Sequence, residues 1–192
     1  MKTIFAIISI LFITACGGGG GKKVLVMASG KFQVSGNTIN LTPGTSHNES
    51  TFVPEGDSIT VVTPSNTQGF SVKESGFYLL NLKKDTIAGT RQHVGLQGET
   101  AQQPRITQEN LKFRIDSLYQ LMIAYNVADS NGQYNLPPFT IKKLTNNTEA
   151  EVIGPFRPIP NSFNPAVEHE VYKFYTNKEI WDLILKLHKM TK

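Results

Sequence analysis

The sequence predicts an α+β fold: an antiparallel, β-rich N-terminal half, then a helix, short extended segments and a C-terminal helix. Three observations support this prediction. Apolar and polar residues alternate across residues 24–98, which is the period of a half-buried strand. An apolar stripe of helical period follows near residues 107–126. A helix-start motif then precedes a second helical segment near residues 177–190.

Short alternating segments fill residues 24–98. The apolar sets are Val24/Val26, Phe32/Val34, Ile39/Leu41, Ile59/Val61, Phe70/Val72 and Tyr78/Leu80/Leu82. Residues two positions apart lie on the same face of a strand. Turn-forming residues, among them Ser29-Gly30 and Ser35-Gly36-Asn37, separate the segments. The pattern predicts six to eight strands in a small sandwich or an open barrel.

Residues 99–192 have a mixed α+β pattern and can form one domain with the preceding region. Thr107 is the expected N-cap of the first helix, and Thr176 with Glu179 is the expected capping box of the second. The predicted inward stripes are Leu111, Ile115, Leu118, Met122 and Tyr125 in the first helix, and Ile180, Ile184 and Leu187, with Trp181 beside them, in the second. Extended segments are expected at residues 139–144, 151–156 and 170–175.

The N-terminus has the pattern of an export signal. Lys2 precedes an almost wholly apolar run over residues 4–15, which is far shorter than the roughly 20 residues that span a bilayer. Residues 1–15 are therefore a predicted signal peptide. Ile13-Thr14-Ala15-Cys16 resembles the lipobox of bacterial lipoproteins. The resemblance implies cleavage before Cys16 and a lipid on its sulfur, which would hold the protein on a membrane.

Five glycines follow Cys16, and residues 16–23 are the expected lipidated cysteine and flexible tether. Cys16 is the only cysteine, so no intramolecular disulfide can form, and lipidation would consume the thiol. The whole chain resembles uncharacterised lipoproteins of Bacteroidota, a resemblance that implies no activity. The tether lacks both the retention aspartate known in enterobacterial lipoproteins and the acidic surface-export signal known in those of Bacteroidota. We therefore expect anchoring in the outer membrane, facing the periplasm.

Composition and motifs argue against several functions. The formal net charge is +4, without a basic stripe interleaved with aromatics, so no nucleic-acid partner is expected. The four histidines lack metal-ligand spacing, and no cofactor motif or Gly-x-Ser-x-Gly element is present. The leading hypothesis is a non-catalytic binding or assembly protein, and the alternative is a lipid-anchored hydrolase of envelope polymers. A deep cleft with converging ionisable groups would favour the hydrolase.

The segment 136–165 is the predicted binding surface, for an envelope glycan or a protein partner. It combines several prolines and aromatics with few charges, and its candidate contact residues are Phe139, Phe156, Arg157 and Phe163. Extended, proline-rich chain loses little entropy on ordering and can present aromatic rings to a ligand. The alternative is a strap whose phenylalanines are buried in the body.

Three short triplets resemble the Asp-Ser/Thr-aliphatic motif to which Bacteroidota attach O-glycans on exported proteins. Their hydroxyl residues are Ser58, Thr86 and Ser117, each preceded by aspartate and followed by an aliphatic residue. The resemblance implies O-glycosylation at these positions. Ordinary turn-to-strand chemistry can produce the same triplets.

Overall fold

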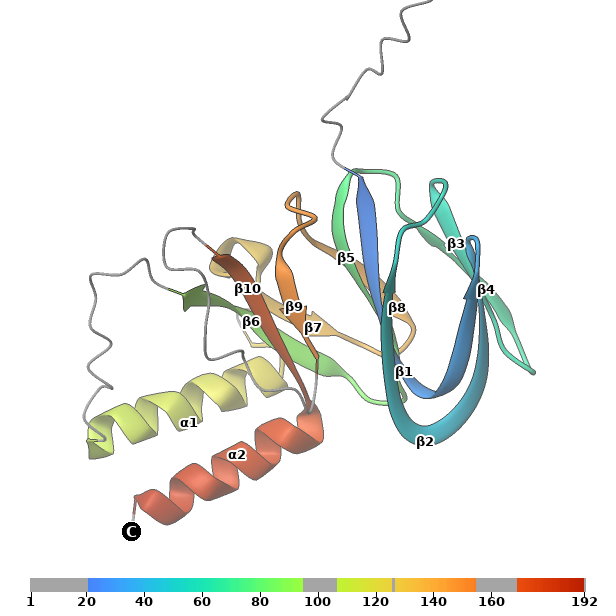
Figure 1. Ribbon diagram of the computed structural model, residues 1–192. Coiled ribbons are helices and arrows are strands. Elements are labelled where there is room, and N and C mark those ends of the chain that lie inside the picture. Colours follow the sequence, from blue (N-terminus) through green and yellow to red (C-terminus); the bar gives the residue numbers. More distant parts are fainter. Residues whose placement is uncertain (1–20, 95–106, 126, 155–168, 192) are drawn as a thin grey trace, which may run out of the picture.

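The computed structural model describes residues 21–94, 107–125, 127–154 and 169–191. Its α+β architecture consists of two β-sheets and a pair of helices, as the sequence predicts (Figure 1). The elements in chain order are β1 (Lys22–Ser35), β2 (Thr38–Phe52), β3 (Ser58–Val62), β4 (Thr67–Ser71), β5 (Gly76–Leu82), β6 (Ile87–Val94), α1 (Gln108–Met122), the 3₁₀ helix η1 (Asp129–Asn131), β7 (Gln133–Leu136), β8 (Thr140–Thr145), β9 (Glu151–Ile153), β10 (His169–Thr176) and α2 (Asn177–Met190).

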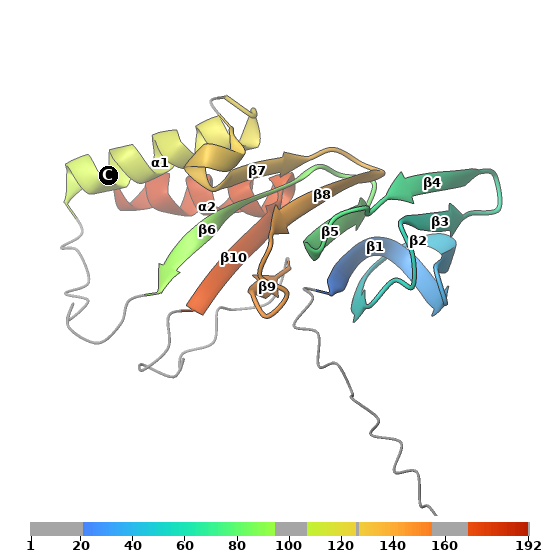
Figure 2. The ribbon, with the colours of Figure 1, turned by 90° about the horizontal axis from the view of Figure 1, so that it is seen from above.

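The first sheet, sheet A, has the strand order β4-β3-β2-β1-β5-β8 and curls strongly on itself (Figures 1 and 2). Its concave side encloses a core cluster. Every apolar set predicted from the alternation lies in this cluster; only Phe32 and Val34 are partly rather than fully buried. The period-2 pattern therefore identified the inner face of sheet A correctly.

Two details of sheet A differ from the prediction. The β1–β5 and β2–β3 pairings are parallel, so the sheet is mixed rather than purely antiparallel. Ser29-Gly30 is not a turn, because β1 continues through it with a shift of register against β2. Gly30 has φ +114°, and a Cβ there would collide with the Thr42 carbonyl oxygen. The glycine thus permits a bulge at which β1 bends against β2.

The second sheet, sheet B, has the order β7-β6-β10-β9 and packs against the convex side of sheet A. Their shared core contains side chains from both sheets, namely Leu25, Met27, Phe77, Leu79, Ile87, Tyr134, Leu136, Leu144, Ala150, Tyr172 and Phe174. Strands β1 and β5 are consequently buried on both faces. Each sheet contains strands from both halves of the chain: β6, from the N-terminal half, lies in sheet B, and β8, from the C-terminal half, is an edge strand of sheet A.

Helices α1 and α2 cover the remaining face of sheet B (Figure 2). The predicted caps are present: the Thr107 side chain accepts a hydrogen bond from the Asn110 amide, and Thr176 and Glu179 form a capping box. The predicted stripe of α1 is wrong at its end, because the helix stops at Met122 and Tyr125 is 58% exposed. Neither helix in the described part of the chain is long and apolar enough to cross a membrane.

Candidate functional site

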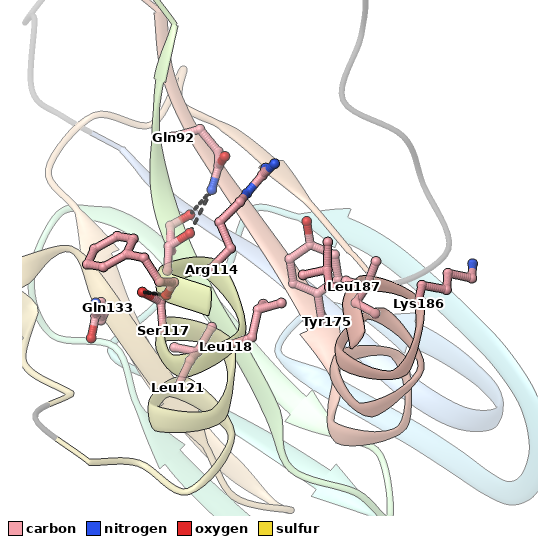
Figure 3. A pocket seen from close by; sticks show the side chains of 12 residues that line it. Gln92, Arg114, Ser117, Leu118, Leu121, Gln133, Tyr175, Lys186 and Leu187 are labelled. Carbon is pink, nitrogen blue, oxygen red and sulfur yellow. Dashed lines mark hydrogen bonds between the residues drawn. The ribbon is translucent and has the colours of Figure 1, made fainter. Parts of the chain in front are cut away.

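A groove of about 540 Å³ lies between the two helices and the outer face of sheet B (Figure 3). We refer to it as the helix groove. Helix α1 supplies one wall, α2 supplies the other, and strands β6, β7 and β10 form the floor. The lining residues are Thr90, Gln92, Phe113, Arg114, Ser117, Leu118, Leu121, Gln133, Tyr175, Leu183, Lys186 and Leu187. The volume falls within the roughly 300–1,000 Å³ of ordinary small-molecule sites.

The floor of the helix groove is polar because sheet B directs its polar positions toward the helices. In β7, Tyr134 points into the core between the sheets, so the neighbouring Gln133 lies on the opposite face. In β6, Thr90 and Gln92 occupy the same face, and Gln92 Nε2 donates to Thr90 Oγ1 at 2.6 Å. The amide and hydroxyl groups of the floor can therefore bind polar atoms of a ligand.

The walls combine leucines with two cations. Arg114 on α1 and Lys186 on α2 are exposed residues that line the helix groove. The described lining contains no carboxylate, imidazole or thiol. Burial, with a smaller contribution from the Glu179 carboxylate, raises the pKa of Tyr175, so its phenol stays neutral. The groove therefore suits a ligand with an apolar body and a negative group.

A second feature, the junction cluster, consists of ionisable residues where sheet A, sheet B and α2 meet: His47, Glu49, Lys83, Lys173 and Glu179. His47 Nδ1 lies 3.1 Å from Lys83 Nζ, and His47 Nε2 lies 3.2 Å from Glu49 Oε2. Lys83 is only 6% exposed. Burial is the main cause that lowers the pKa of both Lys83 and His47, and the Lys83 ammonium lowers that of His47 further.

Lys173 belongs to the same cluster and connects it to the helix groove. Its ammonium donates to the Gly154 carbonyl oxygen at 2.7 Å and lies 5.0 Å from the ring centroid of Tyr175. Burial lowers the pKa of Lys173, and the carboxylates of Glu179 and Glu49 oppose this effect. The ammonium therefore stacks on a ring that lines the groove.

The junction cluster has ionisable groups suited to acid–base chemistry, but most of them are withdrawn from solvent, with His47 and Glu179 the partly exposed members. None of its five residues lines a described pocket, and Lys83 and Lys173 are both buried. No group of three potential metal ligands was found among the described residues. A general acid or base must reach the proton it transfers. What the described contacts do show is that the cluster links sheet A to sheet B through hydrogen bonds and charges.

Of the predicted binding residues, only Phe139 lies within the described part of the chain. It precedes β8, has φ +55°, packs partly against the inner core of sheet A and lines a separate hollow of about 380 Å³. Phe156, Arg157 and Phe163 fall outside the described residues, as does Cys16. Phe139 thus combines features of both sequence-based alternatives, because it is partly buried in the body and also lines a hollow that a ligand can enter.

The three predicted O-glycosylation positions lie on different elements. Ser58 begins β3 and is exposed, whereas Thr86 is half-buried before β6. Ser117 lies in α1, donates to the Phe113 carbonyl oxygen at 2.8 Å and lines the helix groove. Modification at these positions stays a prediction.

The sequence patterns did not identify the helix groove as a site, although Leu118, Leu183 and Leu187 occur in its helices. One signal was available. Thr90 in β6 and Gln133 in β7 are polar residues at alternating positions of their strands. Such alternation predicts that the polar face of the sheet contacts solvent, and it does not predict that two helices cover this face.

Comparisons with protein-family models, with curated proteins and with solved structures found no match to this chain.

Proposed function

We propose that this chain is a lipid-anchored protein of the cell envelope that binds, without catalysis, a small amphipathic anion in the helix groove. The anchor is the lipid expected on Cys16, and the expected location is the periplasmic face of the outer membrane. A monoacyl lipid or a fatty acid has the required chemistry, with an apolar chain and an acidic head group.

The observation that carries this proposal is the distribution of charge around the helix groove. Arg114 and Lys186 contribute cations from opposite walls, and the described lining has no acid to neutralise them. Leu118, Leu121 and Leu187 add apolar surface to the same lining. Burying an acyl chain yields about 0.8 kcal/mol for each methylene group, and each exposed cation adds up to about 1 kcal/mol toward an anion.

The alternative of a lipid-anchored hydrolase requires a nucleophile or an acid–base pair in a cleft. The helix groove contains no carboxylate or histidine in its described lining. The carboxylates of Glu109 and Asp116 lie on exposed positions of α1 and do not line it. These observations support binding over hydrolysis.

Calorimetric titration of the soluble body, residues 21–192, with decanoate and with decanol would test the proposal. Decanoate and decanol share an apolar chain, but only decanoate carries a charge at pH 8. We expect both to bind, with decanoate tighter. The double substitution Arg114→Gln/Lys186→Gln should weaken decanoate binding roughly fivefold or more and leave decanol binding unchanged.

The matched control removes two charges from the same helices outside the groove. Lys112 and Lys189 are exposed residues of α1 and α2 that do not line it. The double variant Lys112→Gln/Lys189→Gln should bind decanoate as the parent does. Equal losses in both double variants, or no binding of decanoate to the parent, would contradict the proposal.

A further inference from the structure

A second hollow, of about 380 Å³, lies at the seam where the curled sheet A comes close to closing. It is lined by Val61, Thr63, Ser65, Asn66, Gln68 and Phe139, and we refer to it as the seam hollow. β4 and β8 are the two edge strands of sheet A. Gln68 of β4 donates a long, 3.5 Å hydrogen bond to the carbonyl oxygen of Phe139, just before β8. The seam hollow therefore joins residues about seventy positions apart in the chain.

Phe139 has an unusual backbone for an aromatic residue. Its φ of +55° lies in the left-handed region, which costs a side chain with a Cβ roughly 1–2 kcal/mol. Glycine or asparagine would normally occupy such a turn position. Strain of this kind persists where the surrounding structure enforces it and is common at ligand sites. Part of the Phe139 ring packs on the inner core of sheet A, and the residue also lines the seam hollow.

The surrounding structure holds the Phe139 turn in place. The buried amide of Asn81 donates to the carbonyl oxygens of Leu136 and Pro137, at 2.9 and 3.1 Å. The Thr140 hydroxyl donates to the same Pro137 carbonyl at 2.7 Å. These bonds fix the turn that carries the aromatic ring, so the ring is positioned before any ligand arrives.

The opposite side of the seam hollow is the turn between β3 and β4. Thr63 Oγ1 donates to the Asn66 carbonyl oxygen and accepts from the Asn66 amide, both at 2.9 Å. Ser65 Oγ lies 3.5 Å from the same hydroxyl. The side-chain amide of Asn66 takes no part in these bonds. The turn is thus rigid, and it presents hydroxyl and amide groups that both donate and accept hydrogen bonds.

The chemistry of the lining selects a ligand class. All six lining residues are uncharged, so nothing in the lining attracts or repels an ion by charge. The combination of one aromatic ring with four hydroxyl and amide side chains is suited to a ring with an apolar C–H face and hydroxyl groups around its edge. Neutral sugars have this shape and polarity.

We propose that the seam hollow binds a neutral carbohydrate residue, with the C–H face of the sugar on Phe139 and its hydroxyls bonded to Thr63, Asn66 and Gln68. This site is separate from the helix groove, shares no lining residue with it, and does not depend on the function proposed there. It assigns a ligand class to Phe139, the one described residue among the four candidate contact residues of the predicted binding surface.

Saturation-transfer NMR and calorimetric titration with neutral trisaccharides would test the site. The protein is the chain from Cys16 onward with Cys16→Ser, and the probes are maltotriose, cellotriose, mannotriose and chitotriose. At least one should bind with a dissociation constant in the millimolar range or tighter. Phe139→Leu should weaken that binding at least fivefold, because leucine keeps an apolar contact with the core but loses the flat ring.

Two matched pairs of variants separate binding from folding. Gln68→Ala should also weaken binding, whereas Gln33→Ala, at an exposed position of β1 outside the hollow, should not. Tyr119→Leu removes a half-exposed aromatic residue of α1 and should leave sugar binding unchanged. If Phe139→Leu lowers the melting temperature strongly, Gln68→Ala decides between the two explanations.

Several results would overturn the proposal. These are no binding of any of the four trisaccharides, equal binding by the parent and Gln68→Ala, or displacement of the sugar by decanoate. An extended peptide that shifts the backbone resonances of β4 and β8, in the absence of sugar binding, would identify the seam as a strand-pairing site instead.

Discussion

The ammonium group of Lys83 lies 3.1 Å from Nδ1 of His47, although the two residues are 36 positions apart in the chain. An ammonium group can only donate to the ring, so with Lys83 protonated Nδ1 accepts and Nε2 carries the proton. Nε2 is then the donor to Glu49 Oε2, 3.2 Å away. The contacts of His47 with Lys83 and Glu49 thus favour one neutral tautomer of the imidazole. A second proton, on Nδ1, would point a donor at the Lys83 ammonium, which is also a donor.

The first prediction concerns Glu49, whose side chain is 5% exposed. Its carboxylate raises the pKa of Lys83, Lys173 and His47, against the effect of burial. Glu49→Gln keeps the shape of the side chain but removes its negative charge, so that Glu179 is the remaining carboxylate that raises the pKa of all three groups. The free energy of unfolding should fall by about 1–3 kcal/mol, measured by urea denaturation.

Glu55→Gln is the matched control, because Glu55 is exposed in the connection between β2 and β3. Its effect should stay within about 0.5 kcal/mol. Equal stability of Glu49→Gln and the parent would show that the carboxylate does not stabilise the cations of the junction cluster.

The second prediction concerns pH. Burial and the Lys83 ammonium lower the pKa of His47 below its usual 6.5, while Glu49 and Glu179 act in the opposite direction. Between the folded pKa and 6.5, the unfolded chain binds more protons than the folded one, so stability rises with pH in this window. Stability should therefore decline as pH falls from 7 toward 5, and His47→Gln should flatten this decline.

His188→Gln provides the comparison for the pH dependence, since His188 is an exposed residue near the end of α2. The melting temperature of each variant would be recorded from pH 7 to pH 5. Carboxylates such as Glu74, whose pKa the Lys143 hydrogen bond lowers, lose their contribution only at more acidic pH. A full decline in His47→Gln would exclude His47 as its source.

The inner core of sheet A could be predicted because each strand there has one buried face. The same method missed the second core, to which Leu25 and Met27 contribute from β1, and Phe77 and Leu79 from β5. Alternation assigned only one face to these strands. Their continuous apolar runs are typical of strands that are buried on both faces, and that signal was present in the sequence.

The end of α1 could not be predicted from its apolar stripe. Tyr125 continues the helical period, but Ala124 adopts φ +57° and the chain leaves the helix after Met122. A left-handed alanine has no local sequence signature, because glycine is the residue that usually permits this conformation.

The two candidate sites depend on contacts that the sequence does not encode locally. The helix groove brings together Gln92, Gln133 and Lys186 from three separate elements. The seam hollow exists because the curl of sheet A brings Phe139 beside Gln68. Of the residues that line the two sites, only Phe139 was predicted from the sequence as a ligand contact, on the basis of its aromatic, proline-rich surroundings.

The third prediction tests the close approach of β6 and β10. Gly89 lies opposite Phe174, and a Cβ at Gly89 would collide with the Phe174 ring and come within 2.6 Å of the Lys173 carbonyl oxygen. Gly89→Ala should therefore lower the free energy of unfolding by about 1–3 kcal/mol, the usual cost of overpacking. Urea denaturation measures the change.

Gly69 in β4 is the matched glycine, because a Cβ there would have no atom within 4 Å. Gly69→Ala should be neutral or slightly stabilising, since alanine restricts the unfolded chain. If Gly89→Ala matched Gly69→Ala in stability, the tight packing of β6 on β10 would be contradicted.

The fourth prediction concerns the anchor. If Cys16 carries the lipid, Cys16→Ala should abolish incorporation of radiolabelled fatty acid and move the protein from the membrane fraction to the soluble fraction. The reason is that each buried methylene contributes about 0.8 kcal/mol of membrane affinity, so two or three acyl chains hold the protein far more firmly than one. Ser9→Ala, inside the predicted signal peptide, should still be lipidated and serves as the control. Continued membrane association of Cys16→Ala would contradict the lipid anchor, and ready digestion of the parent by protease added to intact cells would contradict the periplasmic orientation.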